Sequence, residues 1–293
     1  MEEWSFKEFL DRRDLWNNAL RESVDNNVFL TWEWLSDWWR HFGDKRRFLV
    51  VTVIDGKKIL AAAPLMISRS SLLGLLKVEF IGASTSDYHT FLLTEKSREP
   101  VKMILDYINQ VEPSWGVLEL NNVPEGSKTA GLLGAASIGS MRLVEKKIER
   151  CPYIQLPFSF DDYWRTVNNN FVRGLRRREK RLKENYKMHF KIVAKDEIND
   201  GMKSFFDLHQ KRMRSKGSVG IFSDKQARDF HLDSARSFSE RGWLVLAFLM
   251  LDDEPVAARY GFKYSNKMYD YLPGFDPFYS KYGVGSILIR YVI

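Results

Sequence analysis

Residues 242–264, GWLVLAFLMLDDEPVAARYGFKY, hold two apolar runs on either side of a polar turn at 252–254. Apolar runs around a short polar turn indicate a β-hairpin. Residues 47–67, RFLVVTVIDGKKILAAAPLMI, show the same order of strand, turn and strand. Both second strands contain paired alanines, at 61–62 and at 257–258, so the two stretches lie 196 residues apart. We therefore expect an internal duplication.

The segments around each hairpin support two related halves. Helical spacing of apolar residues precedes both hairpins, and further strand and helix patterns follow both. The expected helices cover residues 5–23, 32–42, 100–111, 159–167, 173–187, 202–217 and 224–242. We predict an α+β protein with two tandem domains, at residues 1–157 and 158–293.

Composition limits the class of protein. The chain has 293 residues, of which 44% are hydrophobic, enough to bury a substantial core. No apolar run approaches the roughly 20 residues of a membrane span, and the N-terminus lacks the pattern of a signal peptide. A cytoplasmic location is the expectation. Cys151 is the only cysteine and the five histidines are scattered, so we predict no internal disulfide and no metal site.

The positive charge is concentrated in one segment. The stretch 173–187, RGLRRREKRLKENYK, carries eight basic and two acidic residues, and so six of the seven net positive charges. An apolar stripe of Phe171, Leu175, Leu182 and Tyr186 predicts a helix with its arginines in solvent. Such a face is either simply solvated or contacts an anion, for which we consider a cofactor phosphate, an acidic acceptor, a membrane surface and transfer RNA.

A small-residue loop follows the second hairpin. We expect a strand at 268–272, a break at Pro273-Gly274, and a helix that begins near Ser286. A helix N-terminus presents unpaired N–H groups, and glycines at 283 and 285 would let a phosphate approach the backbone. Lys281 adds a cation. The alternative is a tight turn into a packed helix. The stretch after the first hairpin, 84–105, has no glycine pair, so only the second half is expected to keep such a cradle.

The ordered series of segments resembles a known superfamily. FFDLHQKRMRSKG at 205–217, the hairpin at 242–264 and GFDPFYSKYGVGSILI at 274–289 resemble GNAT acyltransferases. The likeness is greatest to the branch of CelD-like, cellulose-biosynthesis acetyltransferases, which is related to the tandem FemAB-type aminoacyl ligases. FLTWEWLSDWWRHFG at 29–43 and SDYHTFLL at 86–93 fit the same branch, so the resemblance spans nearly the whole chain.

The resemblance implies two GNAT-like domains, the first free of cofactor. In the second, the loop Lys281, Tyr282, Gly283, Val284, Gly285 and Ser286 would hold the pyrophosphate of acetyl-CoA or another acyl-CoA. The usual basic or amide residue is replaced by Tyr279 or Ser280, so the loop motif is degenerate. GNAT domains continue into a fifth strand and a further helix, and the second domain is therefore expected to be incomplete.

Acyl transfer requires few chemical groups. Backbone N–H groups at Leu272 to Gly274 are candidates to stabilise the oxyanion, and His209, Asp276 and Tyr279 are candidates for the base or proton shuttle. Each has a structural alternative, such as a buried helix histidine or a turn aspartate. Asp87, Tyr88 and His89 either line an acceptor cleft or form a hydrogen-bonded turn. Trp34 and Trp38 share a helix face, which favours core packing over carbohydrate stacking.

The function expected from these features is acyl transfer to an amine or hydroxyl of a sugar, polysaccharide precursor or related metabolite. Two alternatives remain open. One is FemAB-type aminoacyl transfer from transfer RNA, which requires RNA to bind at 173–187. The other is a non-catalytic binding module that retains the fold.

Overall fold

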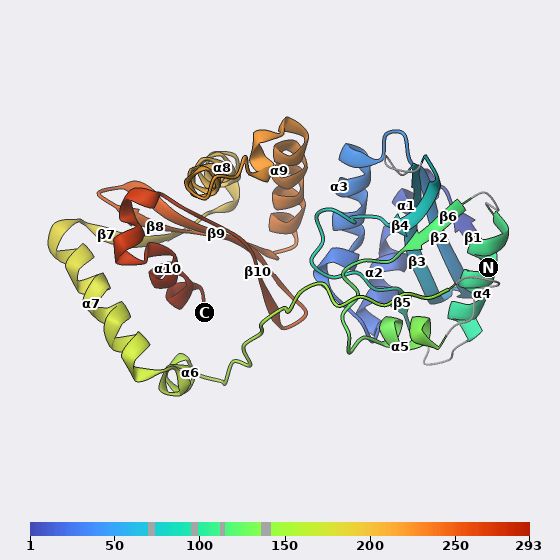
Figure 1. Cartoon of the computed structure of the whole chain (residues 1–293), viewed down its shortest axis with the longest axis horizontal. Helices are drawn as coiled ribbons and strands as arrows, with labels where there is room; N and C mark the ends of the chain where they lie inside the picture. Colours follow the sequence, from blue (N-terminus) through green and yellow to red (C-terminus); the bar gives the residue numbers. More distant parts are fainter. Residues whose placement is uncertain (70–73, 95–98, 112–114, 136–141) are drawn as a thin grey trace. The chain divides into compact units, whose positions relative to one another are not determined.

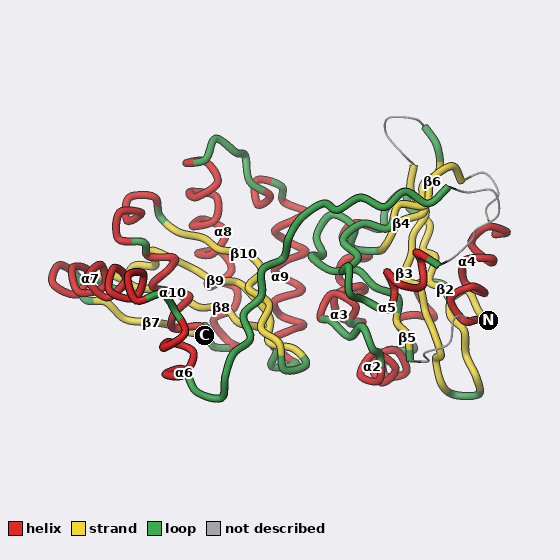
Figure 2. The backbone as a smooth tube through the Cα atoms, turned by 60° about the horizontal axis from the view of Figure 1, so that its bottom comes forward, coloured by secondary structure: helices red, strands yellow, loops and turns green. Residues whose placement is uncertain are grey.

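The computed structural model describes residues 1–69, 74–94, 99–111, 115–135 and 142–293 (Figure 1). The chain divides into two compact units, unit 1 at Met1–Ile148 and unit 2 at Glu149–Ile293. This division falls nine residues before the expected boundary at 157. Residues 142–157 contain neither helix nor strand and form the loop that leads into α6 (Figure 2), so no element marks a sharper boundary.

Unit 1 is built on one mixed sheet with strand order β1-β2-β3-β4-β6, and β5 pairs with β3. Only the pair of β4 and β6 is parallel. Its elements are β1 (Glu2–Trp4), α1 (Phe6–Asp11), α2 (Arg13–Glu22), the 3-10 helix η1 (Val28–Leu30), α3 (Trp32–Phe42), β2 (Arg47–Asp55), β3 (Lys58–Arg69), β4 (Leu76–Phe80), β5 (Leu92–Leu93), α4 (Glu99–Val111), β6 (Trp115–Glu119) and α5 (Lys128–Gly134).

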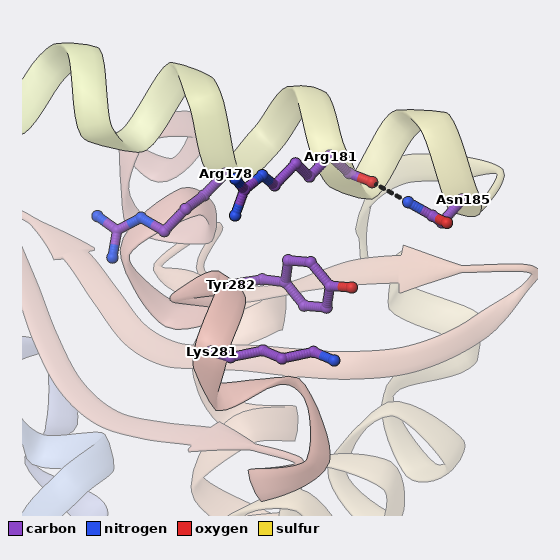
Figure 3. A pocket seen from close by; sticks show the side chains of 5 residues that line it. All are labelled: Arg178, Arg181, Asn185, Lys281 and Tyr282. Carbon is purple, nitrogen blue, oxygen red and sulfur yellow. Dashed lines mark hydrogen bonds between the residues drawn. The ribbon is translucent and has the colours of Figure 1, made fainter.

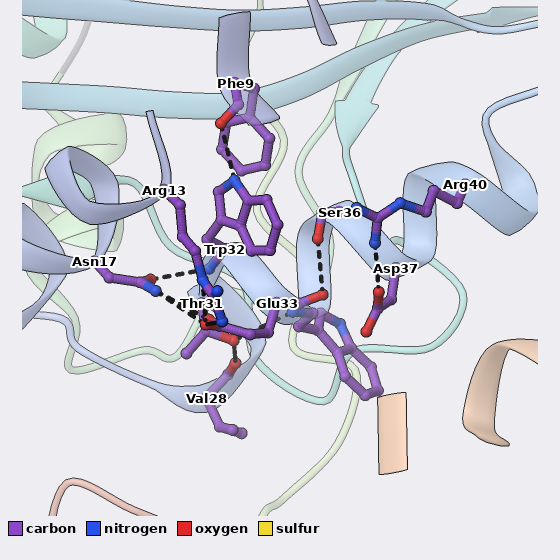
Figure 4. Close-up of polar contacts among 11 residues, drawn as sticks. Phe9, Arg13, Asn17, Val28, Thr31, Trp32, Glu33, Ser36, Asp37 and Arg40 are labelled. Carbon is purple, nitrogen blue, oxygen red and sulfur yellow. Dashed lines mark hydrogen bonds and ion pairs between the residues drawn. The ribbon is translucent and has the colours of Figure 1, made fainter. Parts of the chain in front are cut away.

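The first three helices of unit 1 are joined by partly buried polar contacts (Figure 4). The Glu33 carboxylate is 1% exposed and accepts hydrogen bonds from Arg13 at 2.7 Å and from Asn17 at 3.0 Å. A buried charge is tolerated when it is paired and hydrogen-bonded in this way. Trp34 and Trp38 are both buried, which confirms that they belong to the core.

Unit 2 contains an antiparallel sheet with strand order β10-β9-β8-β7. Its elements are α6 (Phe160–Thr166), α7 (Asn169–Asn185), β7 (Met188–Ile192), η2 (Lys195–Glu197), α8 (Ile198–Ser215), η3 (Ile221–Ser223), α9 (Lys225–Glu240), β8 (Leu244–Leu251), β9 (Glu254–Tyr264), β10 (Lys267–Phe275), η4 (Pro277–Tyr282) and α10 (Val284–Val292). Among the described helices of both units, none is long and apolar enough to cross a lipid bilayer.

Helices cover both faces of the unit 2 sheet (Figure 1). Helices α8 and α9 lie on one face, where Phe205 contacts Tyr260 and Phe238 contacts Phe262. Helices α7 and α10 lie on the other, in a core that includes Leu175 on α7 and Ile287 on α10. Alternate residues of a strand point to opposite faces, so each strand supplies both cores.

The two hairpins are confirmed, and they share one register. All eight residue pairs of β8 and β9 recur in β2 and β3 when 196 is subtracted from their numbers. The β-bulge recurs as well, between Val53 and Ile54 in one hairpin and between Leu249 and Met250 in the other. A bulge shifts every later pair by one residue, so its repetition is more specific than the alanine pattern.

Three local expectations are corrected. The apolar stripe of α7 runs through Val172, whereas Phe171 is exposed. Helix α10 begins at Val284, two residues before Ser286, because Gly283 provides its left-handed N-terminal cap. Strand β10 does not break at Pro273 but continues to Phe275. Proline is accommodated there because β10 is an edge strand among the described residues.

Candidate functional site

The N-terminus of α10 offers free backbone donors. The Gly283 carbonyl accepts the N–H groups of Ser286 at 2.9 Å and Ile287 at 3.0 Å. In the described chain the N–H groups of Val284 and Gly285 donate to no backbone carbonyl. A helix N-terminus also carries the positive end of the helix dipole. This first turn can therefore accept an anion.

Gly283 is required by the geometry of the turn. Its φ is +63°, the left-handed region that favours glycine. A Cβ at this position would lie 3.0 Å from Nη1 of Arg178 on α7. Glycine thus permits both the turn and the close approach of the guanidinium group.

A pocket of about 230 Å³ lies beside this turn (Figure 3). Arg178, Arg181 and Asn185 of α7 line one side, and Lys281 and Tyr282 of η4 line the other. Asn185 donates to the Arg181 carbonyl at 2.7 Å. None of the three cations forms an ion pair with a carboxylate in the described chain. Like charges that share a pocket without a counterion favour the binding of an anion there.

A buried ionic cluster fixes α7 against α10. Glu179 of α7 accepts hydrogen bonds from Lys183 at 2.7 Å, from Arg290 at 2.5 Å and from the Tyr291 hydroxyl at 2.6 Å. Burial alone would raise the pKa of Glu179, but these partners outweigh it and lower the pKa. Burial, assisted by Glu179, raises the pKa of Tyr291 to about 12. The cluster holds the pocket arginines in place beside η4.

The irregularity of β10 lies earlier than the sequence indicated. The register shifts between Tyr269 and Leu272, where a β-bulge forms. The Asp276 N–H donates to the Val256 carbonyl of β9 at 2.9 Å. In an antiparallel ladder every second residue points its N–H toward the neighbouring strand, so the N–H groups of Leu272 and Gly274 also point toward β9. Those two N–H groups are therefore unavailable to an oxyanion, contrary to our expectation.

His209 lies in the interface between α8 and β10. It is buried, and its Nδ1–H donates to the Pro273 carbonyl at 3.0 Å. Burial lowers the pKa of His209, which keeps the imidazole neutral at physiological pH. Its ring also packs against Phe205 and Phe222. These contacts indicate that His209 holds β10 in position.

Asp276 and Tyr279 lie next to each other at the start of η4. Asp276 Oδ1 accepts the Phe278 N–H at 3.0 Å, and Oδ2 pairs with Lys211 Nζ at 2.7 Å. Burial acts to raise the pKa of Asp276, but Lys211 and the Phe278 N–H lower it overall. Burial raises the pKa of Tyr279, whose ring contacts Tyr186 at 5.7 Å. At neutral pH Asp276 is thus a carboxylate and Tyr279 a protonated phenol.

The predicted acceptor residues belong to unit 1. His89 is buried, its Nδ1 lies 3.1 Å from the Asn121 carbonyl, and its ring stacks on Phe80 at 5.0 Å. The backbone of the preceding residues is also held, since Asn122 donates to the Ser86 carbonyl at 2.9 Å. Asp87 and Tyr88 lie in this bonded segment, so an acceptor role for the three residues remains a prediction.

The sequence predicted Lys281 to Ser286 but did not select Arg178 and Arg181. For the basic segment 173–187 as a whole, the sequence suggested a cofactor phosphate only as one of several anions that it could contact. The signal that could have found them is their spacing, because residues 178, 181 and 185 share one helix face. In the described chain, no three His, Cys, Asp or Glu side chains gather as a metal site requires.

Comparisons with known proteins identify the second unit. Residues 169–293 match the family model described as "Acetyltransferase (GNAT) domain", so this part of the chain is a GNAT-type acetyltransferase domain. No curated protein matches the chain in sequence.

Two solved structures share the fold of the whole chain. The structure of FemX aligns with a TM-score of 0.64 at 10% identity, over 100% of this chain and 85% of that chain. A conserved protein of unknown function from Bacteroides thetaiotaomicron VPI-5482 aligns with a TM-score of 0.57 at 13% identity, over 99% and 87%. At such low identity these likenesses establish the mixed fold of sheets and helices and nothing about substrates.

Proposed function

We propose that unit 2 binds acyl-CoA and that the protein transfers its acyl group to an amine or hydroxyl of a sugar, polysaccharide precursor or related metabolite. A CelD-like acetyltransferase is the specific form of this proposal. It is supported by the GNAT domain match and by one observation above all. Two unpaired N–H groups, at Val284 and Gly285, lie next to a pocket with three unpaired cations.

The residues fit a pyrophosphate in charge and in shape. The N–H groups of Val284 and Gly285 would donate to phosphate oxygens, as at other helix N-termini. Arg178, Arg181 and Lys281 would neutralise their charge. Bound there, acyl-CoA would supply a thioester carbonyl to the attacking acceptor.

The candidate catalytic residues would take different roles. The Asp276 carboxylate is placed to accept a proton, although its pairing with Lys211 makes it a weak base. Tyr279 keeps its proton at neutral pH and can donate it to a leaving group. His209 would act as a positioning residue, because its Nδ1–H is engaged by the Pro273 carbonyl.

The experiment compares the melting temperature with and without acetyl-CoA in the wild type, Gly285→Glu and Gly285→Ala. The nearest atom to a Cβ at 285 is Arg259 Nη2 at 4.0 Å, so alanine fits and serves as the matched control. Glutamate places a negative charge in the first turn, where it suits the helix dipole but repels a phosphate. Ligand at about a hundred times its Kd stabilises by about 2.7 kcal/mol, which is several degrees.

We expect the shift in the wild type and in Gly285→Ala, and none in Gly285→Glu. No shift in the wild type contradicts the proposal and favours the non-catalytic module. A shift that survives in Gly285→Glu places the cofactor elsewhere. Binding of aminoacyl-tRNA with no binding of acetyl-CoA would instead favour the FemAB-type reaction.

A further inference from the structure

The outer face of α7 carries arginines of which all but one lie outside the proposed acyl-CoA pocket. Arg173, Arg177 and Arg181 follow one another at four-residue spacing and form the α7 basic face. All three are exposed, and none has a carboxylate partner in the described chain. By contrast, Lys183 on the same helix pairs with Glu179, and Lys180 pairs with Glu184. Of the basic face, only Arg181 also lines the pocket.

A run of exposed apolar side chains leads to the start of this helix. Residues 153–160, the apolar segment, have the sequence YIQLPFSF. Tyr153 is 88% exposed and Phe158 is fully exposed. Phe171, in the first turn of α7, is 45% exposed. The exposed members of the set are Tyr153, Ile154, Leu156, Phe158, Phe160 and Phe171.

These two features lie next to each other in unit 2. The apolar segment enters α6, and residues 167–168 join α6 to the N-terminal end of α7 (Figure 1). A run of exposed apolar side chains close in sequence to arginines without carboxylate partners is uncommon on a surface that faces only water. This combination of apolar and cationic side chains is complementary to a partner with an apolar interior and an anionic surface.

We propose that the α7 basic face and the apolar segment bind the surface of an anionic lipid bilayer. Arginines attract the anionic headgroups, and Phe and Tyr enter the interfacial layer. The aliphatic side chains of Ile154 and Leu156 favour lipid over RNA, since bases stack on aromatic rings and gain nothing similar from aliphatic groups. The proposed contact is peripheral, made by these side chains at the bilayer surface. This inference does not depend on acyl-CoA binding.

The test is co-sedimentation of the full chain with vesicles of phosphatidylcholine alone and of phosphatidylcholine with phosphatidylglycerol. The wild type should bind the anionic vesicles and should not bind the neutral ones. Arg173→Gln with Arg177→Gln should reduce the partition coefficient roughly 30-fold at low salt. Arg214→Gln is the matched control, since Arg214 is an exposed α8 arginine without a carboxylate partner in the described residues. It should bind like the wild type.

Salt separates the two parts of the surface. The effect of the arginine changes should shrink as salt screens the charges. Phe158→Ser with Phe171→Ser should weaken binding at low and high salt alike, because burial of apolar surface is not screened by salt. Both double variants alter exposed side chains, and unchanged melting temperatures would show that they fold.

Several results would overturn the proposal. These are no vesicle binding, equal binding to neutral and anionic vesicles, and equal loss in Arg214→Gln. Salt-sensitive binding to single-stranded RNA without vesicle binding would make the surface a nucleic-acid site. Self-association that is abolished by the phenylalanine changes, again without vesicle binding, would make it an interface between copies. An unchanged acetyl-CoA shift in the arginine variant would show that the two proposals succeed or fail separately.

Discussion

Units 1 and 2 share a hairpin with the same register and the same bulge, yet they differ at the next strand. In unit 2 the third strand, β10, is continuous, with a small bulge between Tyr269 and Leu272. In unit 1 it is divided into β4 and β5, and residues 81–91 lie between them. Both β4 and β5 pair with β3, as β10 pairs with β9. The hairpin is therefore the same in both units, and the difference is the segment that unit 1 inserts into its third strand.

The inserted residues 81–91 of unit 1 form hydrogen bonds and ring contacts with the rest of that unit. Trp34 donates to the Ser86 hydroxyl at 2.9 Å, and His89 stacks on Phe80. The equivalent position of unit 2 has no such inserted segment. Gly261 of β9 instead lets the Tyr269 carbonyl of β10 come close to it. A Cβ at 261 would lie only 2.2 Å from that oxygen. We infer that unit 1 uses the inserted segment for stability, whereas β10 of unit 2 continues directly to η4 and the candidate site.

The largest expected effect concerns the packing of residues 81–91 in unit 1. Trp34→Ala removes a fully buried indole and its hydrogen bond to Ser86. Replacement of a buried tryptophan by alanine costs about 3–5 kcal/mol. Hydrogen exchange measured on peptides of each unit should show the loss in unit 1, with acetyl-CoA binding unchanged. Comparable loss of protection in unit 2 would show that the two units do not behave as separate structures.

The second test uses pH. Burial lowers the pKa of His89 to about 4, against a usual value of 6.5, and its hydrogen bonds oppose this only in part. The unfolded chain therefore binds the proton first, so unit 1 should lose stability as pH falls from 6.5 to 4. The loss is roughly 3 kcal/mol. Urea unfolding at several pH values should show a flatter dependence in His89→Gln, and an unchanged slope would exclude His89 as the group.

These two tests concern residues whose roles the sequence left open. Periodicity predicted the hairpins, most helices and the buried tryptophans, because each depends on local spacing. It could not predict that β10 continues through Pro273, because only the edge position of the strand makes proline acceptable there. The spacing of Arg178 and Arg181 places them on one helix face, but it could not show that this face approaches η4, since that depends on how α7 packs against α10. The Glu179 cluster that sets this packing joins residues more than a hundred positions apart.

The third test strains the turn at Gly283 in unit 2, which belongs to the proposed cofactor site. Gly283→Ala places a side chain at φ +63° and beside Arg178. The backbone cost is about 1–2 kcal/mol. We expect a lower melting temperature and weaker acetyl-CoA binding, measured on the same samples. Gly134→Ala is a suitable control, because a Cβ there meets nothing within 4 Å and its φ lies outside the left-handed region. Weakening of the same size in the control would contradict this account of Gly283.

The smallest effect concerns the hairpin turns. Asp252 and Asp253 both have positive φ, at 51° and 67°. The first hairpin has a glycine in its turn, Gly56, at φ 58°. Asp253→Gly relieves strain in unit 2, and we expect stabilisation of about 0.5–1 kcal/mol in urea unfolding. Destabilisation would mean that the contact of Asp253 with Lys187 contributes more than an exposed ion pair usually does.

The central claim is that unit 2, and not unit 1, binds acyl-CoA. Its most direct measurement is the stoichiometry of coenzyme A binding by titration calorimetry, in the wild type and in Arg178→Gln with Arg181→Gln. Arg214→Gln provides the control for loss of positive charge. We expect one site per chain, lost or strongly weakened in the double variant and retained in the control. Two sites, no site, or one site that is indifferent to the double variant would contradict the account.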